Sequence, residues 1–191
     1  MQELLRTVKN TIPEDTDNPF LLGPFTPNFN EYNADTDTLK VKGEIPKDLH
    51  GIYVRNTHNQ VHESIGIYHP FDGDAMLHAV HFEDGKAFYR NRFVETTGFL
   101  AEQAAEKSLW PGILAPGQYQ RRGWGSMGAM KDNAGTDVNC HAGQLLVAMS
   151  QGSEPWRLDP VTLENLGPDK NWAADVMPVG VSAHFKVDVF T

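Results

Sequence analysis

The chain has 191 residues, enough for one domain with a real core or for part of a larger one. Hydrophobic residues make up 40% and charged residues 21%, which is typical of folded globular proteins and excludes a disordered chain. Sixteen Lys and Arg against 25 Asp and Glu give a net charge of −9. Because this charge repels phosphate backbones, we expect no nucleic-acid partner.

The compartment is indicated by cysteine content and by the N-terminal residues. A single cysteine, Cys140, excludes an intrachain disulfide and fits a reducing compartment. Residues 1–19 are polar and lack the apolar run of a signal peptide. No stretch approaches the roughly 18–20 apolar residues that a membrane-spanning helix needs. The sequence therefore predicts a cytoplasmic protein whose contact with lipid, if any, is peripheral.

The first part of the chain predicts irregular structure followed by short strands. Residues 1–38 read as an irregular lead-in because prolines interrupt every longer pattern (Pro13, Pro19, Pro24, Pro27). Residues 39–42 alternate apolar and basic side chains, and residues 51–55 are aromatic and β-branched. Both patterns favour strands.

A β-hairpin is the clearest local prediction. Residues 76–82 and 87–94 are two strand-like runs that flank Asp84-Gly85. Asp-Gly between such runs indicates a tight turn, because Gly tolerates the positive φ that the turn requires.

One helix interrupts the strands. Residues 99–109 are rich in helix formers, Thr97 is a plausible N-terminal cap, and Pro111-Gly112 would stop the helix. A Gly-rich loop is expected over 122–128.

Strands resume after this loop. We expect them over 143–150, 156–158 and 161–166, with a turn at Asp159-Pro160. Strands with one inserted helix predict an all-β propeller or sandwich. No clean repeat period is visible, so periodicity alone does not select the propeller.

Two pairs of histidines invite a metal hypothesis without supporting it. His58 and His62 have zinc-ligand spacing, but their surroundings have little helical character, so solvated loop histidines are the favoured interpretation. His78 and His81 lie three apart on a predicted strand and face opposite sides, which favours structural roles.

Two further motifs have ordinary explanations. Asp72-Gly73-Asp74 lacks the other oxygen ligands of a calcium loop and is better explained as a tight turn. Cys140 and His141 look like a nucleophile and its base, but adjacent strand residues face apart. Composition and spacing alone thus indicate a mainly β protein and leave metal binding open.

Seven blocks in a fixed order resemble the carotenoid cleavage oxygenase family. The first two include Asn-Pro-Phe-Leu-Leu-Gly and Gly-Glu-Ile-Pro-Lys-Asp-Leu-His-Gly-Ile-Tyr-Val-Arg-Asn, and the last includes Ser-Ala-His-Phe-Lys-Val-Asp. The order carries the resemblance better than any single block does. The blocks span residues 18–23, 43–56, 68–80, 89–94, 141–146, 158–164 and 182–188.

The resemblance implies the N-terminal part of a seven-bladed β-propeller, with a lead-in over 1–38 and the first blades over 39–191. It implies a central Fe²⁺ held by four histidines, with O₂ as co-substrate for cleavage of a carbon–carbon double bond in an apolar polyene. His184 matches the first of these ligands, and imidazole suits Fe²⁺. The alternative interpretation of His184 is a core histidine whose hydrogen-bonding groups are satisfied within the protein.

The other three ligands of such proteins lie well downstream of the position that matches His184. We therefore expect a fragment or truncated product of a carotenoid or apocarotenoid dioxygenase, inactive alone, with no further catalytic side chain in this chain. A non-catalytic propeller scaffold is the rival, and an unrelated β binding module a third alternative.

Departures from the family pattern affect the expected site. Gln151 stands where relatives carry a glutamate that accepts a hydrogen bond from a ligand histidine, although Glu154 is near enough to substitute. Residues 57–60 replace the usual Gly-Pro-Asn-Pro turn. Ser150 stands where lignostilbene-cleaving relatives have a lysine, which favours a carotenoid over a stilbene. Tyr89 matches either their substrate tyrosine or a buried cross-strand aromatic.

A short apolar segment follows the predicted helix. In the family, the corresponding region often forms an apolar patch at the tunnel mouth that touches membranes. Trp110, Ile113 and Leu114 suit such a patch, because an indole ring is amphipathic. A loop packed on the propeller face is the equally weighted alternative.

Overall fold

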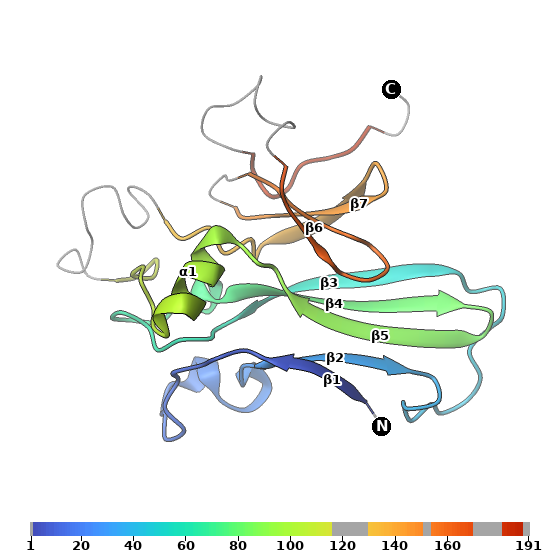
Figure 1. Cartoon of the computed structure of the whole chain (residues 1–191), viewed down its shortest axis with the longest axis horizontal. Helices are drawn as coiled ribbons and strands as arrows, with labels where there is room; N and C mark the ends of the chain where they lie inside the picture. The colour runs from blue at the N-terminus through green and yellow to red at the C-terminus, as the bar shows by residue number, and fades with distance from the viewer. Residues whose placement is uncertain (1, 116–129, 151–153, 170–180, 189–191) are drawn as a thin grey trace.

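A computed structural model describes residues 2–115, 130–150, 154–169 and 181–188. These residues form two antiparallel β-sheets and one α-helix, with three short 3₁₀ turns (Figure 1). The 3₁₀ turns span Pro19–Leu21, Gly23–Phe25 and Pro70–Asp72. The mainly β prediction with one inserted helix is confirmed.

The first sheet has five strands in the order β1-β2-β5-β4-β3. The predicted hairpin forms its centre, with Asp84 and Gly85 at positive φ in the turn. The strand predicted at residues 51–55 is longer than expected and ends at Asn59. The five strands are β1 Glu3–Thr7, β2 Asn30–Asp35, β3 Gly51–Asn59, β4 Asp74–Glu83 and β5 Lys86–Phe93.

The second sheet is a four-stranded meander in the order β6-β7-β8-β9. Ala142 and Gly143 make its first turn with positive φ, and Asp159 caps the last one by accepting the amides of Val161 and Thr162. The strands are β6 Asp137–His141, β7 Gln144–Ala148, β8 Trp156–Leu158 and β9 Asn165–Pro168.

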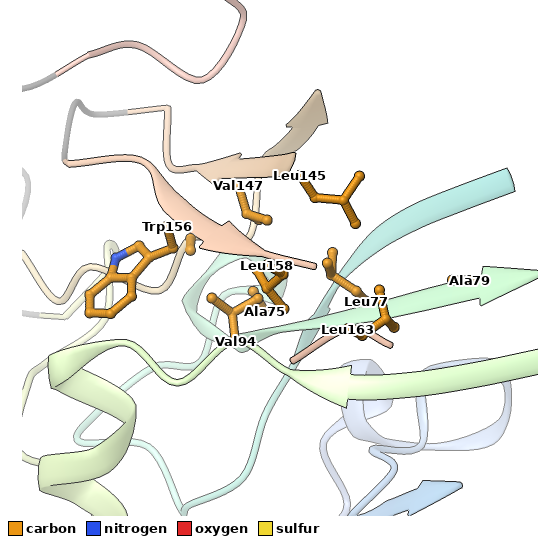
Figure 2. Packing of buried hydrophobic residues seen from close by; sticks show 10 residues of the cluster. Ala75, Leu77, Ala79, Val94, Leu145, Val147, Trp156, Leu158 and Leu163 are labelled. Carbon is orange, nitrogen blue, oxygen red and sulfur yellow. The ribbon is translucent and has the colours of Figure 1, made fainter. Parts of the chain in front are cut away.

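The two sheets pack against each other through one apolar cluster (Figure 2). β4 contributes alternate residues because every second side chain of a strand points to the same face. The second sheet contributes residues of β7 and β8 and of the turn after β8. The cluster comprises Ala75, Leu77, Ala79, Val94, Ala134, Leu145, Val147, Trp156, Leu158 and Leu163.

The helix α1, Thr97–Ala105, begins earlier and ends earlier than predicted. Thr96 caps it by accepting the Phe99 amide at 3.0 Å, and the chain leaves the helix at Glu106, which has φ of 52°. Phe99 stacks on Phe93 of β5, with ring centroids 5.0 Å apart. A left-handed residue after Ala105 therefore ends the helix, well before the proline-glycine pair.

Three stretches differ from the sequence-based prediction. The lead-in over 1–38 is not irregular throughout, because β1 and β2 extend the first sheet from β5 outward. Residues 39–42 form no strand, although they alternate. The last predicted strand begins at Asn165, since residues 159–163 make a turn. The loop predicted at 122–128 lies outside the described residues.

Within the described ranges, no helix has the length and apolar character needed to cross a bilayer.

Candidate functional site

His184 lies in the segment 181–188, beside the start of the second sheet. Its side chain is 67% exposed, and its Nδ1 atom is 3.1 Å from Oδ2 of Asp137. The preceding residue, Ala183, is fully buried. His184 is therefore not a core histidine, and its imidazole is held on one side by a carboxylate.

Asp137 is the first residue of β6 and is well oriented. Its Oδ1 accepts the amide of Val138 at 2.8 Å, which turns Oδ2 toward His184. Asn56 of β3 ties this corner to the first sheet: its Nδ2 donates to the carbonyl of Ala134 at 2.8 Å and to that of Asp137 at 3.4 Å. The Val138 amide thus orients the carboxylate that faces His184, and Asn56 ties the backbone of Asp137 to the first sheet.

The metal donors near His184 are few. No group of three or more His, Cys, Asp and Glu side chains in the described part of the chain could hold an ion. The Nε2 atom of His184 is the atom left for a metal when Nδ1 faces a carboxylate, which is the usual arrangement of a ligand histidine. The described residues therefore fit one ligand of a larger set.

The side chains of His58 and His62 contact different residues and do not form a common metal site. His58 stacks on Phe71, with ring centroids 5.1 Å apart. His62 is only 2% exposed, and its ring nitrogens lie 3.3 Å from Thr11 Oγ1 and 3.0 Å from Gln103 Nε2. The prediction of solvated loop histidines is thus wrong for both, because His58 belongs to β3 and His62 is buried, and burial lowers the pKa of both imidazoles.

The pair on β4 is separated as predicted. Nδ1 of His78 is 2.8 Å from the Tyr89 hydroxyl, and His81 lies near Phe88, with ring centroids 6.2 Å apart. Burial lowers the pKa of His78 to about 4, so the imidazole is neutral at pH 7, and its Nδ1 atom shares a hydrogen bond with the Tyr89 hydroxyl. The Tyr89 hydroxyl is therefore already engaged in a cross-strand contact.

The Asp72-Gly73-Asp74 motif forms a turn, but its two carboxylates bind different partners. Asp72 accepts the amides of His69 and Ile113, both at 2.8 Å. Asp74 is buried and pairs with Lys131 at 2.7 Å. Gly73 is required, because a Cβ there would lie 2.7 Å from the backbone nitrogen of Asn59.

Lys131 occupies the centre of a buried ion cluster. Its Nζ contacts Asp74 of β4 and, at 2.5 Å, Glu102 of α1. Burial alone would lower the pKa of Lys131, but the two carboxylates outweigh it and raise the pKa. The lysine is therefore charged and joins the helix to the first sheet.

The segment with Trp110, Ile113 and Leu114 is held through its backbone amides and is partly exposed to solvent. The Glu102 carboxylate accepts the amides of Leu109 at 2.7 Å and Trp110 at 3.4 Å. Leu114 is 53% exposed, whereas Trp110 and Ile113 are half-buried. The segment is thus both packed and apolar at its surface.

Several residues of the expected site lie elsewhere or were missed. Gln151 lies outside the described residues. Ser150 donates its amide to Thr136 Oγ1 at 3.0 Å, next to Asp137. Asp137 itself was not found from the sequence, because it lies 47 residues from His184 and belongs to no local motif.

The comparisons with known proteins identify the family. The family model described as "Retinal pigment epithelial membrane protein" matches residues 25–191. The chain belongs to this family, which includes carotenoid cleavage oxygenases. It is 37% identical over 153 residues to isoeugenol monooxygenase of Pseudomonas nitroreducens, covering 78% of this chain and 30% of that protein. It is 34% identical over 155 residues to apocarotenoid-15,15'-oxygenase of Synechocystis, covering 78% and 31%.

Solved structures agree with this assignment. Lignostilbene dioxygenase of Pseudomonas brassicacearum matches with a TM-score of 0.73 and 29% identity, over 91% of this chain and 35% of that one. Cobalt-substituted apocarotenoid oxygenase of Synechocystis matches with a TM-score of 0.64 and 29% identity, over 83% and 33%. The resemblance to carotenoid cleavage oxygenases is confirmed. The chain spans about a third or less of the length of these relatives.

Proposed function

We propose that this chain is the N-terminal part of an Fe²⁺-dependent dioxygenase that cleaves a carbon–carbon double bond of a carotenoid or apocarotenoid. The observation that carries the proposal is the His184 imidazole, exposed and held at Nδ1 by Asp137 within a family match that extends to residue 191. An exposed imidazole fixed by a carboxylate is suited to bind a metal through its other nitrogen.

The proposed architecture is the start of a seven-bladed propeller. Two antiparallel sheets that pack face to face are consistent with two successive blades. Residues 39–191 supply most of these strands, and β1 and β2 of the lead-in complete the outer side of the first sheet. Further blades would supply the other ligands.

The metal chemistry is proposed by family membership and by the donor type. A ferrous ion would activate O₂ for insertion across the double bond, and neutral imidazoles suit that ion. In this chain, His184 would bind it through Nε2. One imidazole does not hold Fe²⁺ usefully, so we expect the 191-residue chain alone to show no turnover.

The substrate proposal depends on two described side chains. Ser150 occupies the position where lignostilbene-cleaving relatives carry a lysine for the phenol, and the Tyr89 hydroxyl is engaged with His78. This chain therefore lacks that lysine, and its Tyr89 hydroxyl already has one partner, which favours a carotenoid or apocarotenoid over a stilbene. A phenylpropene or stilbene is the second candidate, because relatives are named isoeugenol monooxygenase and lignostilbene dioxygenase.

A propeller scaffold without catalysis is the rival proposal. Gln151 in place of a glutamate and the altered residues 57–60 at the end of β3 favour it. His184 with its carboxylate opposes it, because a scaffold has no need of an oriented imidazole.

The test is a chimera in which this chain replaces the corresponding part of Synechocystis apocarotenoid-15,15'-oxygenase. We expect the chimera to cleave an apocarotenal into two carbonyl products, and His184→Ala to abolish product in chromatography. His81→Ala is the matched control and should retain activity, since His81 lies on β4 with no tie to His184. A folded, iron-loaded chimera in which His184→Ala keeps full turnover would refute the proposal.

Gln151 is proposed as the position that supports a ligand histidine of the complete site. In the chimera, Gln151→Glu should tighten iron binding, because loss of such a supporting carboxylate typically costs roughly 10–100-fold in affinity. Unchanged affinity in a metal titration would show that Gln151 does not have this role.

Peripheral membrane contact is proposed for the segment of Trp110, Ile113 and Leu114. Its carrying observation is Leu114, 53% exposed beside two half-buried apolar side chains. Replacing all three by serine should reduce sedimentation of the chimera with phosphatidylcholine vesicles. Val161→Ser is the control, because Val161 is 43% exposed in the turn before β9. Equal sedimentation of both variants would contradict membrane contact.

A further inference from the structure

We propose that Asp137 is the positioning residue of His184: its carboxylate fixes the imidazole as the Nδ1–H tautomer and leaves Nε2 free to bind the metal. This inference rests on the proposed function for the metal, but the tautomer itself is a property of this chain.

The chemistry of the contact determines the direction of the hydrogen bond. An ionised carboxylate only accepts hydrogen bonds, so at 3.1 Å from Asp137 Oδ2 the Nδ1 atom of His184 must donate. A neutral imidazole carries one proton, and Nε2 is then the lone-pair nitrogen. Metal binding needs that lone pair, so the contact prepares the ligand before any ion arrives.

The carboxylate is held in place independently of His184. Its Oδ1 accepts the Val138 amide at 2.8 Å, which uses the first peptide unit of β6 as an anchor. Asn56 of β3 donates to the Asp137 carbonyl at 3.4 Å and to the Ala134 carbonyl at 2.8 Å. Asp137 is also short, with few rotamers to restrict, and its side chain is 32% exposed. An acceptor with so little freedom can dictate the orientation of its partner.

The charge of Asp137 also distinguishes it from Gln151. A glutamine carbonyl accepts a hydrogen bond but brings no charge, whereas a carboxylate makes the opposite nitrogen of the ring a stronger donor to the metal.

The test reads the tautomer directly in the ¹⁵N-labelled 191-residue chain. Long-range ¹H–¹⁵N correlation spectra distinguish the protonated ring nitrogen from the bare one, at a pH of about 9 where an ordinary imidazole is neutral. His184→Gln assigns the signals. We expect a larger share of Nδ1–H in the unchanged chain than in Asp137→Ala, which should shift the ratio of tautomers about two- to fivefold toward Nε2–H, the effect of a partly exposed charged contact.

Control variants separate positioning from a change in fold. Asp137→Glu should restore Nδ1–H, because it returns the charge, and Asp48→Asn, an exposed acid with no contact to His184, should leave the ratio unchanged. A ratio that is the same with and without the Asp137 carboxylate would overturn the inference.

Addition of Co²⁺ to the same samples tests the metal step separately. We expect Co²⁺ in large excess, enough for the weak binding of a single imidazole, to broaden the His184 ring signals through Nε2, and Asp137→Ala to weaken this broadening. Tautomer control without any broadening by Co²⁺ would contradict the metal half of the inference and would leave the positioning half confirmed. Broadening that does not change in Asp137→Ala would overturn the positioning half alone.

Discussion

Lys131 bridges two carboxylates from different elements, Asp74 of β4 and Glu102 of α1, and all three side chains are at most 12% exposed. A buried charge whose partner is removed is far more costly than the pair itself is stabilising. The cluster is therefore a point where one substitution affects both the helix and the sheet.

Replacing Lys131 by Met should lower the free energy of unfolding by about 3–5 kcal/mol, because two carboxylates would remain buried without a cation. Urea unfolding followed by circular dichroism measures this loss. Lys9→Met is the control, since the Lys9–Glu106 pair is exposed and its removal should leave stability nearly unchanged. Equal losses in the two variants would contradict the assignment.

The buried histidines predict a dependence of stability on pH. His78 has its pKa lowered to about 4 by burial, below the ordinary 6.5 of the unfolded chain. Between these values the unfolded state binds the additional proton, so stability is present above pH 6.5 and is lost as the pH falls toward 4. His58 and His62 add to the effect in the same direction.

His78→Gln should flatten this dependence. The slope removed is at most about 1.4 kcal/mol per pH unit, and smaller because His78 is partly accessible. Urea unfolding of the unchanged chain and of His78→Gln across this pH range gives the difference between their stabilities. The contribution of the carboxylates is common to both and cancels in this difference. Parallel curves would show that His78 is protonated equally in both states.

At the scale of elements, α1 and the segment after it behave as one unit. The Glu102 carboxylate accepts the amides of Leu109 and Trp110, and Asp72 accepts that of Ile113. Gly112 leaves room for this contact, because a Cβ there would lie 2.0 Å from Asp72 Oδ2. Carboxylates of Glu102 and Asp72 therefore hold the backbone of the apolar segment, in addition to the packing of its side chains.

Glu102→Gln should accelerate amide hydrogen exchange at Leu109 and Trp110, since an amide oxygen is a weaker acceptor than a carboxylate. Glu106→Gln on the exposed end of the same helix should leave their protection unchanged. Exchange followed by mass spectrometry or NMR decides between them. Slow exchange in both variants would mean that other contacts fix the segment.

Local signals predicted some elements well and others poorly. The β4–β5 hairpin could be predicted because the dipeptide Asp84-Gly85 favours a tight turn by itself. β1 and β2 were missed because their polar sequences become strands only by pairing with β5 and with each other. The end of α1 could not be predicted, because the amino-acid sequence around Glu106 does not indicate that this residue adopts a left-handed backbone conformation.

At the scale of the whole molecule, the site could be predicted only in part. The order of seven blocks predicts the family, which the family match confirms, and it predicts His184 as a metal ligand, which stays a prediction. The cluster around Lys131 and the partner Asp137 could not be predicted, because each joins residues far apart in the sequence. Such partners depend on how the two sheets meet.

The cluster between the sheets should make them unfold together. Leu158 of β8 is fully buried between the sheets, so Leu158→Ala should cost about 2–5 kcal/mol and lower the stability of both (Figure 2). Leu166→Ala, at a position 38% exposed, is the matched control and should cost much less. Two separate transitions in denaturant would show that the sheets are independent.

The measurement that tests the central claim most directly is the iron content of the chimera with apocarotenoid oxygenase, determined by mass spectrometry after gel filtration. With His184 present, we predict about one iron per polypeptide. His184→Ala should bring the content close to zero while circular dichroism shows the same fold. Full iron occupancy in folded His184→Ala protein would contradict the account.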